Sequence, residues 1–237
     1  MSATTPQRRF ALSEQSSVGD SAATQTLSAA QSRVYWDRRH ATTGALASGG
    51  NIGFDEPTNA MLYAVRAARL VTALGPGTDP GAGRRVLDAG CGKGYYTRLL
   101  AEFGHRVDGI DTSAHAIGEC RALAGPRQSY HVSALTDWSP PYLYDAIVSI
   151  DVLYHLMDDA EWEASIRHLA TLVRLGGRIG LVDHDRDEDR VWRDYQKTRS
   201  NGRYREVLES CGFAVIGFIR NDFTDDPSGM HLAVRVS

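Results

Sequence analysis

The sequence predicts an α/β fold in which a mostly parallel sheet carries helices on both faces. Residues 85–89 form a short apolar strand that ends in a glycine-rich turn, and residues 95–103 then carry helical spacing. Apolar strands and amphipathic helices alternate from there until residues 213–220 and 230–236, two strands with no helix between them. Such alternation is typical of parallel strands joined by helical crossovers, and the final pair predicts an antiparallel hairpin.

The same periodicity predicts the other elements of this core. Further strands are expected at residues 105–110, 129–132, 145–150 and 178–183, and helices at residues 114–124, 160–173 and 204–211. Ahead of the core, the expected elements are a short amphipathic helix at residues 32–40, a glycine-bearing lid at 43–53 and a helix at 57–74. The chain is therefore divided into a disordered tail (1–28), a helical cap with its linker (29–83) and the core (84–237).

Composition restricts the classes of function. The 237 residues are 42% hydrophobic, which suits one globular domain, and the net charge of −3 offers no basic surface for nucleic acid. No apolar run is long enough for a membrane span or a signal peptide. We therefore expect a cytoplasmic monomer or homodimer that binds neither nucleic acid nor membranes. The three cysteines are far apart in sequence, so neither a disulfide framework nor a metal site is predicted.

The segment Gly90-Cys91-Gly92-Lys93-Gly94 is the main indication of a ligand. Glycines allow a sharp turn and a close approach of a ligand to the backbone. Asp111 ends the next strand, about twenty residues later, where dinucleotide-binding folds place the acid that binds a ribose diol. A nicotinamide-dependent oxidoreductase is the competing interpretation. Tyr95 disfavours it, because that fingerprint needs a small residue there, and Asp88 would repel a pyrophosphate but attract an ammonium group.

With these residues the chain resembles the class I S-adenosylmethionine-dependent methyltransferases, whose first motif runs apolar-Leu-Asp-x-Gly-x-Gly-x-Gly. The motif stands at residues 86–94, and the resemblance continues through Asp111 and residues 144–155 and 172–179. It covers roughly residues 84–237. It implies a Rossmann-like doubly wound, mostly parallel seven-stranded sheet with a C-terminal antiparallel hairpin and an N-terminal helical cap. It also implies S-adenosylmethionine as the cofactor and S-adenosylhomocysteine as the product.

Ligands of such sheets bind beyond the carboxyl ends of the strands. By resemblance, the adenine is expected near residues 133–135, and the methionyl part near Asp88, Gly90 and residues 150–151. The complete predicted cofactor set is Tyr35, Asp88, Gly90, Cys91, Gly92, Asp111, Thr112, Ser133, Ala134, Leu135, Ile150 and Asp151.

Three histidines are candidate general bases. Methyl transfer from a sulfonium releases a neutral leaving group, so a base is needed only when the acceptor keeps a proton. His155 follows the fourth strand, and the alternative is that it caps the next helix or closes the pocket. His184 follows the fifth strand beside Asp183, or simply begins the charged run 183–190, which we interpret as a solvated loop or helix start. His115 follows Asp111 and is the weakest candidate, since it can also face cofactor or solvent.

Trp36 and Tyr154 are candidates for contact with the acceptor, with plain core packing as the alternative, and Phe54 is expected to belong to a lid loop that closes over the substrate. The segments at 35–37 and 151–159 resemble those of small-molecule methyltransferases from bacterial natural-product pathways. The sequence thus predicts methyl transfer to an oxygen, nitrogen or sulfur atom of a small molecule in specialised-metabolite, antibiotic-type biosynthesis. A non-transferring S-adenosylmethionine-binding protein, or a rearrangement catalyst on the same fold, is the alternative.

Overall fold

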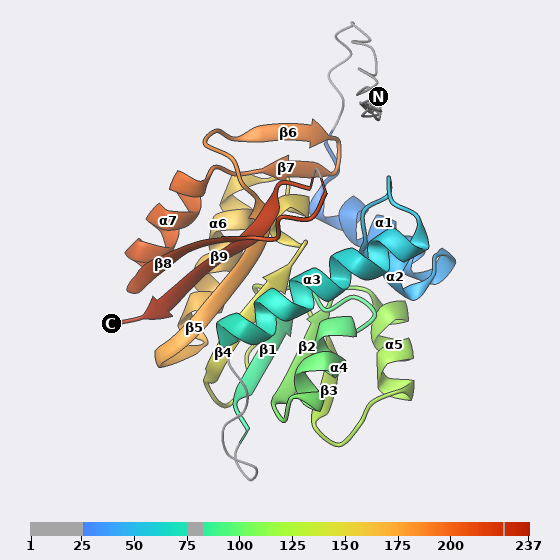
Figure 1. The fold of residues 1–237 in the computed structure, drawn as a ribbon, viewed down its shortest axis with the longest axis horizontal. Helices are drawn as coiled ribbons and strands as arrows, with labels where there is room; N and C mark the ends of the chain where they lie inside the picture. The colour runs from blue at the N-terminus through green and yellow to red at the C-terminus, as the bar shows by residue number, and fades with distance from the viewer. Residues whose placement is uncertain (1–25, 75–82, 225) are drawn as a thin grey trace, which may run out of the picture.

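The computed structural model describes residues 26–74, 83–224 and 226–237. Its centre is a seven-stranded sheet with the strand order β3-β2-β1-β4-β5-β9-β8 (Figure 1). The strands are β1 (Arg85–Ala89), β2 (Arg106–Asp111), β3 (Gln128–Val132), β4 (Tyr144–Ile150), β5 (Val173–His184), β8 (Phe213–Arg220) and β9 (Ser228–Arg235). The first five run parallel, and β9 lies antiparallel between β5 and β8. The predicted doubly wound sheet with a terminal antiparallel pair is confirmed.

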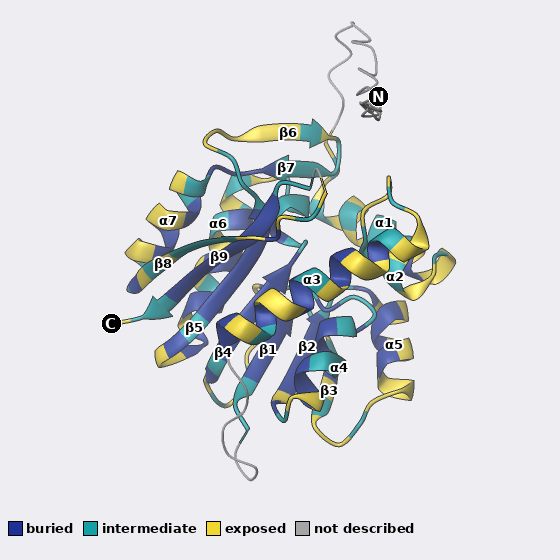
Figure 2. Cartoon of the chain, viewed as in Figure 1, coloured by how far each residue is buried: buried dark blue, intermediate teal, exposed yellow. Residues whose placement is uncertain are grey.

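Helices cover both faces of the sheet. One face carries α3 (Glu56–Leu74), α4 (Tyr95–Glu102) and α5 (Ala114–Ala122), and the other carries α6 (Asp159–Thr171) and α7 (Asn201–Ser210). Successive residues of β1 point to opposite faces, so Val86 packs with α3 and α4 while Leu87 packs with α6. Burial on both faces explains why Val86, Leu87 and Ala89 of this strand are all apolar (Figure 2).

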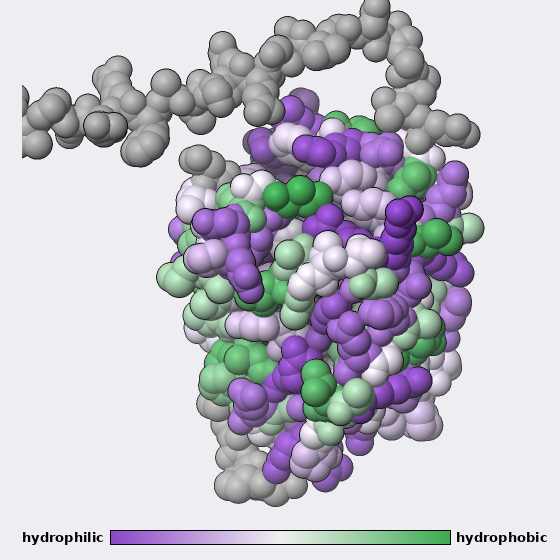
Figure 3. Space-filling model, turned by 90° about the vertical axis from the view of Figure 1, so that its right-hand side faces the viewer, coloured by the Kyte–Doolittle hydropathy of each residue, from purple (hydrophilic) through white to green (hydrophobic). Residues whose placement is uncertain are grey.

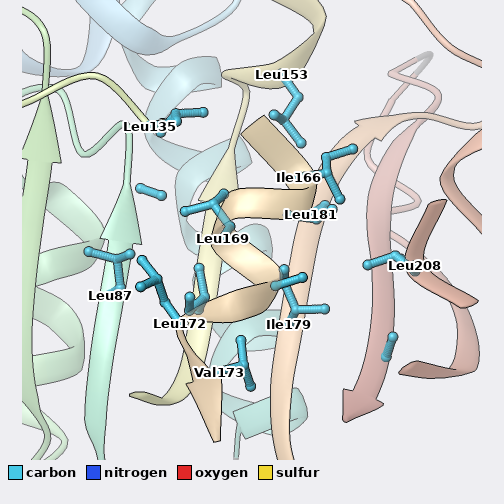
Figure 4. Close-up of a cluster of buried hydrophobic side chains, with 14 of the residues drawn as sticks. Leu87, Leu135, Leu153, Ile166, Leu169, Leu172, Val173, Ile179, Leu181 and Leu208 are labelled. Carbon is cyan, nitrogen blue, oxygen red and sulfur yellow. The ribbon is translucent and has the colours of Figure 1, made fainter. Parts of the chain in front are cut away.

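The core beneath α6 combines branched aliphatic side chains with aromatic ones such as Trp162 and Tyr204. Figure 4 shows Ile166 and Leu169 of α6 directed toward the sheet, where Leu87 and Leu181 lie. The helix begins where Asp158 accepts a hydrogen bond from the backbone N–H of Glu161 at 2.8 Å, which satisfies one of the unpaired donors of the first turn.

The N-terminal cap contains α1 (Ala29–Thr42) and α2 (Ala45–Gly49). Asp37 of α1 accepts hydrogen bonds from the Ser113 hydroxyl at 2.7 Å and from the backbone N–H of His115 at 3.1 Å, so α1 is fixed to the start of α5. The predicted lid at 43–53 includes α2, whose Ala47 and Ser48 carbonyls each accept a hydrogen bond from Arg39 at 2.8 Å. The cap is therefore held in place by side chains of α1.

Two expectations about the segments after β4 were wrong. The helix predicted over 160–173 ends at Thr171, because Val173 already pairs with Tyr144 of β4. The charged run 183–190 is not one solvated segment, because Asp183 and His184 end β5 and pair with β9. A hairpin that periodicity did not predict follows, formed by β6 (Arg190–Arg193) and β7 (Gln196–Thr198).

Of the predicted tail over residues 1–28, only the last three residues fall within the described part of the chain, and most of the predicted linker lies outside it as well. In the ranges that the structure covers, no helix combines the length and apolar character that crossing a membrane requires. On the face seen in Figure 3, which includes the side of α1, α2 and α5, apolar residues form small groups among polar ones.

Candidate functional site

A cavity of about 500 Å³ lies at the carboxyl ends of β1, β2 and β4. Figure 1 shows α1 and the β6–β7 hairpin at this same end of the sheet. The predicted residues that line the cavity are Trp36, Gly90, Cys91, Gly92, Asp111, Thr112, Ser133, Ala134, Leu135, Ile150, Asp151, Tyr154, His155 and His184. Four predicted residues, Tyr35, Phe54, Asp88 and His115, are not part of the lining.

The glycine turn forms one wall of the cavity. The backbone N–H groups of Gly90 and Cys91 donate to the carbonyl of Ile110 at 2.8 and 2.9 Å, which joins the turn to the end of β2. Gly90 has φ 85°, and a Cβ there would lie 2.3 Å from the side chain of Val152. Only glycine meets both conditions, so the turn requires it.

Asp111 lies beside this turn with capacity for further hydrogen bonds. Its two carboxylate oxygens accept the backbone N–H groups of Gly92 at 2.9 Å and Ser113 at 2.8 Å. Because a carboxylate offers about four lone pairs, it can accept two more donors, such as the hydroxyls of a ribose. His40 of α1 approaches from the other side, since a Cβ on Gly92 would lie 3.2 Å from its ring.

His40 is a cavity residue that sequence reasoning missed. Its side chain is buried, and burial lowers its pKa, so the ring is neutral at pH 7. Its Nδ1 has no hydrogen-bond partner among the described residues. A buried polar atom of this kind is available to a ligand.

Asp88 is absent from the cavity wall because it lies beneath the turn. It is 1% exposed and accepts a hydrogen bond from the Thr97 hydroxyl of α4 at 2.6 Å. Burial raises the pKa of Asp88 to about 6. Asp88 therefore connects β1 to α4 through this hydrogen bond and does not line the cavity.

The end of β4 carries a buried ion pair. Asp151, with φ 59°, pairs with Arg66 of α3, which also contacts Asp226 at 3.4 Å and Ser228 at 3.1 Å. Burial raises the pKa of Asp151, and the Arg66 charge opposes this rise. Oδ1 of Asp151 and the hydroxyl of Tyr96 line the cavity and lack hydrogen-bond partners within the described chain. A ligand could therefore donate a hydrogen bond to the Asp151 oxygen and form another with the Tyr96 hydroxyl.

Five rings form what we call the acceptor chamber: Trp36, Tyr154, His155, His184 and Tyr195, all of which line the cavity. The His155 ring lies 4.4 Å from both Trp36 and Tyr154, and the His184 ring stacks on Tyr154 at 5.2 Å. Tyr195 comes from the turn between β6 and β7, and because periodicity did not predict this hairpin, Tyr195 was not among the predicted site residues. Tyr35 is not part of the lining, but its ring stacks on that of Tyr195 at 5.3 Å.

Both histidines of the chamber are neutral at pH 7, because burial lowers the pKa of each to about 4. His155 donates from Nδ1 to the carbonyl of Tyr195 at 2.8 Å. Since a carbonyl can only accept, the neutral ring carries its proton on Nδ1 and a lone pair on Nε2. Nδ1 of His184 lies 2.9 Å from the hydroxyl of Thr198.

Arg199, the residue after β7, joins the hairpin to the segment that follows η1 (Leu153–His155), the short 3₁₀ helix that carries two chamber residues. It is fully buried and donates to the carbonyls of Leu156 at 2.5 Å and Met157 at 3.2 Å, and to Asp159 at 2.9 Å. One buried guanidinium thus holds two sides of the chamber together.

Two predicted residues lie elsewhere. Phe54 contacts Phe223 edge-on at 6.2 Å, so it packs against the segment before β9 and does not close the cavity. His115 pairs with Glu119 at 2.9 Å on the exposed side of α5, because one helical turn separates the two side chains. Neither residue lines the cavity that holds the chamber histidines.

The fold and the site define an α/β protein that binds a nucleoside-type cofactor at the carboxyl edge of its sheet. Residues 61–214, well over half of the chain, match the model of a methyltransferase domain family. The chain belongs to this family, and it is a class I S-adenosylmethionine-dependent methyltransferase with S-adenosylmethionine as its cofactor.

Several curated relatives share part of this chain. A ubiquinone biosynthesis O-methyltransferase from Aromatoleum aromaticum is 33% identical over 103 residues, 41% of this chain and 43% of that protein. A tRNA U34 carboxymethyltransferase from Shewanella halifaxensis is 33% identical over 160 residues, 63% of this chain and 47% of that protein. The O-methyltransferase resE from Aspergillus sclerotiorum is 26% identical over 196 residues, 74% and 72% of the two chains. The chain spans less than half the length of the first two of these relatives.

Solved structures share the fold. The 1,6-didemethyltoxoflavin-N1-methyltransferase of Burkholderia thailandensis, with bound 1,6-didemethyltoxoflavin and S-adenosylhomocysteine, has a TM-score of 0.64 at 20% identity, covering 86% of this chain and 89% of its own. The magnesium protoporphyrin IX methyltransferase of Synechocystis PCC 6803, with bound S-adenosylmethionine, has a TM-score of 0.65 at 24% identity, covering 89% of this chain and 100% of its own.

The cavity residues suit the chemistry of this cofactor. Asp111 has lone pairs for the ribose hydroxyls, and the turn at Gly90 brings backbone, not side chain, to the cavity wall. The unpartnered atoms of His40, Tyr96 and Asp151 are polar groups that an amino-acid moiety can satisfy. The polar part of the cavity therefore fits S-adenosylmethionine, and the aromatic chamber forms the rest of the lining.

Proposed function

We propose that this chain transfers a methyl group from S-adenosylmethionine to an oxygen, nitrogen or sulfur atom of a small molecule of specialised metabolism. One observation carries the proposal: the glycine turn with Asp111 and the acceptor chamber with its two neutral histidines line the same cavity. A cofactor bound at the first set and an acceptor bound in the second would share one enclosed space, as group transfer requires.

The residues divide into those that would hold the cofactor and those that would hold the acceptor. Asp111 would bind the ribose hydroxyls, and the backbone of Gly90 and Gly92 would lie against the cofactor. When bound, S-adenosylmethionine supplies an electrophilic methyl group on a positively charged sulfur. The face of Tyr154 would attract this positive charge, because aromatic ring faces are electronegative. The chamber's main task would be to align the acceptor, since alignment supplies much of the rate of such a transfer.

Proton transfer is the second task of the chamber. An alcohol, phenol or protonated amine must lose a proton as it is methylated, whereas a thioether need not. His155 and His184 are neutral and line the chamber, so each can present an unprotonated ring nitrogen. This supports acceptors that carry an ionisable proton.

The dimensions and charge of the site support a small acceptor. A cavity of about 500 Å³ is within the ordinary size of small-molecule pockets, which run from about 300 to 1,000 Å³. The net charge of −3 provides no overall attraction for the phosphate backbone of a nucleic acid. Five aromatic rings favour a flat acceptor that can lie against them.

The test is a transfer assay with S-adenosylmethionine and a panel of phenols, alcohols, amines and thiols, with bulk tRNA included because one group of relatives acts on tRNA. Mass spectrometry would detect S-adenosylhomocysteine and the product that has gained a methyl group. We expect turnover with a flat small molecule and none with tRNA. Methylated tRNA, or tight cofactor binding with no turnover across a broad panel, would contradict the proposal; the second result would favour a non-transferring binding protein.

A further inference from the structure

His155 and His184 differ in the groups that contact their Nδ1 atoms. Within the part of the chain that the structure describes, the hydrogen-bond partner of the His155 Nδ1 is a backbone carbonyl, and the nearby charge of Arg39 disfavours protonation of this ring. The Nδ1 of His184 lies 2.9 Å from the Thr198 hydroxyl and 3.6 Å from a carboxylate oxygen of Asp183. A carboxylate at this distance stabilises a protonated ring, and a carbonyl does so far less.

Asp183 is an unusual carboxylate for a structural residue. It is fully buried at the end of β5, and it accepts hydrogen bonds from the Tyr204 hydroxyl at 2.7 Å and from the backbone N–H of His184 at 2.7 Å. The Thr198 hydroxyl supplies a third hydrogen bond. These donors favour the ionised form, while burial raises the pKa of Asp183 to about 7.

Thr198 connects the two residues, and its donors and acceptors can be assigned. Its hydroxyl oxygen accepts a hydrogen bond from the indole N–H of Trp192 at 3.1 Å, because an indole nitrogen can only donate. The single hydroxyl proton then points either to Asp183 or to His184. Toward an ionised Asp183, the hydroxyl donates to the carboxylate and accepts Nδ1–H of His184, which leaves the lone pair of His184 on Nε2.

Resting on the proposed function, we infer that Asp183, Thr198 and His184 form a hydrogen-bonded relay in which His184 is the general base of the acceptor chamber. Thr198 and Asp183 are positioning residues that fix its tautomer and stabilise its charged form. His155, whose Nδ1 donates to the carbonyl of Tyr195 and not to a carboxylate, holds the acceptor through the lone pair on Nε2.

The proton step balances within these residues. The acceptor's O–H or N–H bond breaks, its proton forms a bond with Nε2 of His184, and the electron pair left on the acceptor atom forms the bond to the methyl carbon. The electron pair of the broken carbon–sulfur bond stays on sulfur, which becomes neutral. The protonated His184 ring still donates from Nδ1 to the hydroxyl oxygen of Thr198. The negative charge of Asp183 stabilises this ring until the proton on Nε2 passes to solvent.

Other charged groups near the relay act through space. The charge of Asp226 favours protonation of His184, whereas Arg66 and Arg186 disfavour it. The nearby charge of Asp151 disfavours ionisation of Asp183. Among the described residues, only Thr198 is recorded as a hydrogen-bond partner of the His184 ring. The hydroxyl is therefore the contact whose removal tests the relay.

Nitrogen NMR of histidine-labelled protein saturated with S-adenosylhomocysteine tests this relay without an acceptor. In the wild type at pH 8 we expect His184 to carry its proton on Nδ1. Thr198→Val removes the hydroxyl at nearly constant shape, so the ring should lose this tautomer preference. Thr198→Ser should restore it. The exposed Thr171→Val is the matched control, and His155 should keep its proton on Nδ1 throughout.

A His184 tautomer that is identical in the wild type and Thr198→Val would overturn the relay. So would a preference for Nε2–H at pH 8 in the wild type. Asp183→Asn provides a second arm: the relay predicts that His184 becomes harder to protonate in this variant, and an unchanged titration of its ring signals contradicts it. Calorimetric binding of S-adenosylhomocysteine is measured on the same samples. Binding with no tautomer change rejects the relay alone, whereas absence of binding by the wild type rejects the proposed function.

Discussion

Arg66 of α3 and Asp151 at the end of β4 form a buried ion pair that connects a helix of the N-terminal region to the carboxyl edge of the sheet. The pair is separated by 85 residues in sequence, and both side chains line the cavity. Arg66 is 6% exposed and also contacts Asp226 near β9. One guanidinium thus joins three segments at the site.

Loss of this ion pair should destabilise the fold. Arg66→Met leaves two largely buried carboxylates, those of Asp151 and Asp226, without their partner, and removing one member of a buried pair typically costs about 3–5 kcal/mol. Arg69→Met is the matched control on the same helix, because Arg69 is 46% exposed and 3.8 Å from Asp222, where a pair contributes about 0–1 kcal/mol. Urea unfolding measures both variants. Equal free energies of unfolding for the two would contradict the structural role assigned to Arg66.

Asp111→Ala should weaken cofactor binding. The variant loses hydrogen bonds to a charged acceptor, worth about 1.5–3 kcal/mol, so the Kd for S-adenosylhomocysteine should rise about tenfold or more. Asp111→Asn keeps the shape of the side chain but loses its charge, so its Kd should lie between those of the wild type and Asp111→Ala. Asp137→Ala changes an exposed acid outside the cavity lining and serves as the control. Wild-type affinity in Asp111→Ala, measured by calorimetry, would remove Asp111 from the ribose site.

The two histidines of the chamber should differ in kinetics once the panel identifies an acceptor with an ionisable proton. His184→Gln should lower kcat about a hundredfold or more, the usual effect of losing a general base. His155→Gln should mainly raise the KM for the acceptor. Both should bind S-adenosylhomocysteine as the wild type does. A larger fall in kcat for His155→Gln than for His184→Gln would exchange the two roles.

A buried histidine in β9 should make the fold sensitive to acid. Burial lowers the pKa of His231 to about 3, and the ring stacks on Tyr204 at 4.2 Å. Between pH 6.5 and 3, His231 is protonated in the unfolded chain but stays neutral in the folded protein, so the free energy of unfolding falls as the pH falls. His231→Phe should reduce this loss by about 1.4 kcal/mol per pH unit below 6.5. Urea unfolding at pH 8 and at pH 5 measures it, and the same pH dependence in both proteins would disprove the assignment.

The sheet could be predicted because its signals are local. Each strand, turn and helix between residues 85 and 150 is set by its own apolar spacing, and Gly90 marks a turn that only glycine fits. Asp111 could be identified for the same reason, since its role depends on its distance from that turn along the chain.

The rest of the cavity is formed by contacts between distant segments. His40 lies next to Gly92 because Asp37 fixes α1 to the start of α5, and the spacing of apolar residues in the sequence does not predict how these two helices pack. Tyr195 enters through a hairpin whose strands are only four and three residues long, too short for a periodic pattern. Asp183 ends the predicted strand 178–183 and also begins the charged run 183–190 that was expected to be solvated; its pairing with β9 buries it, as the strand prediction implies.

The most direct test of the central claim is calorimetric titration of the wild-type chain with S-adenosylmethionine, S-adenosylhomocysteine and NADH. The account predicts saturable binding of the first two near one site per chain and no saturable binding of NADH. Binding of NADH alone would contradict the roles given to the glycine turn and Asp111, and would return the chain to the nicotinamide-dependent interpretation.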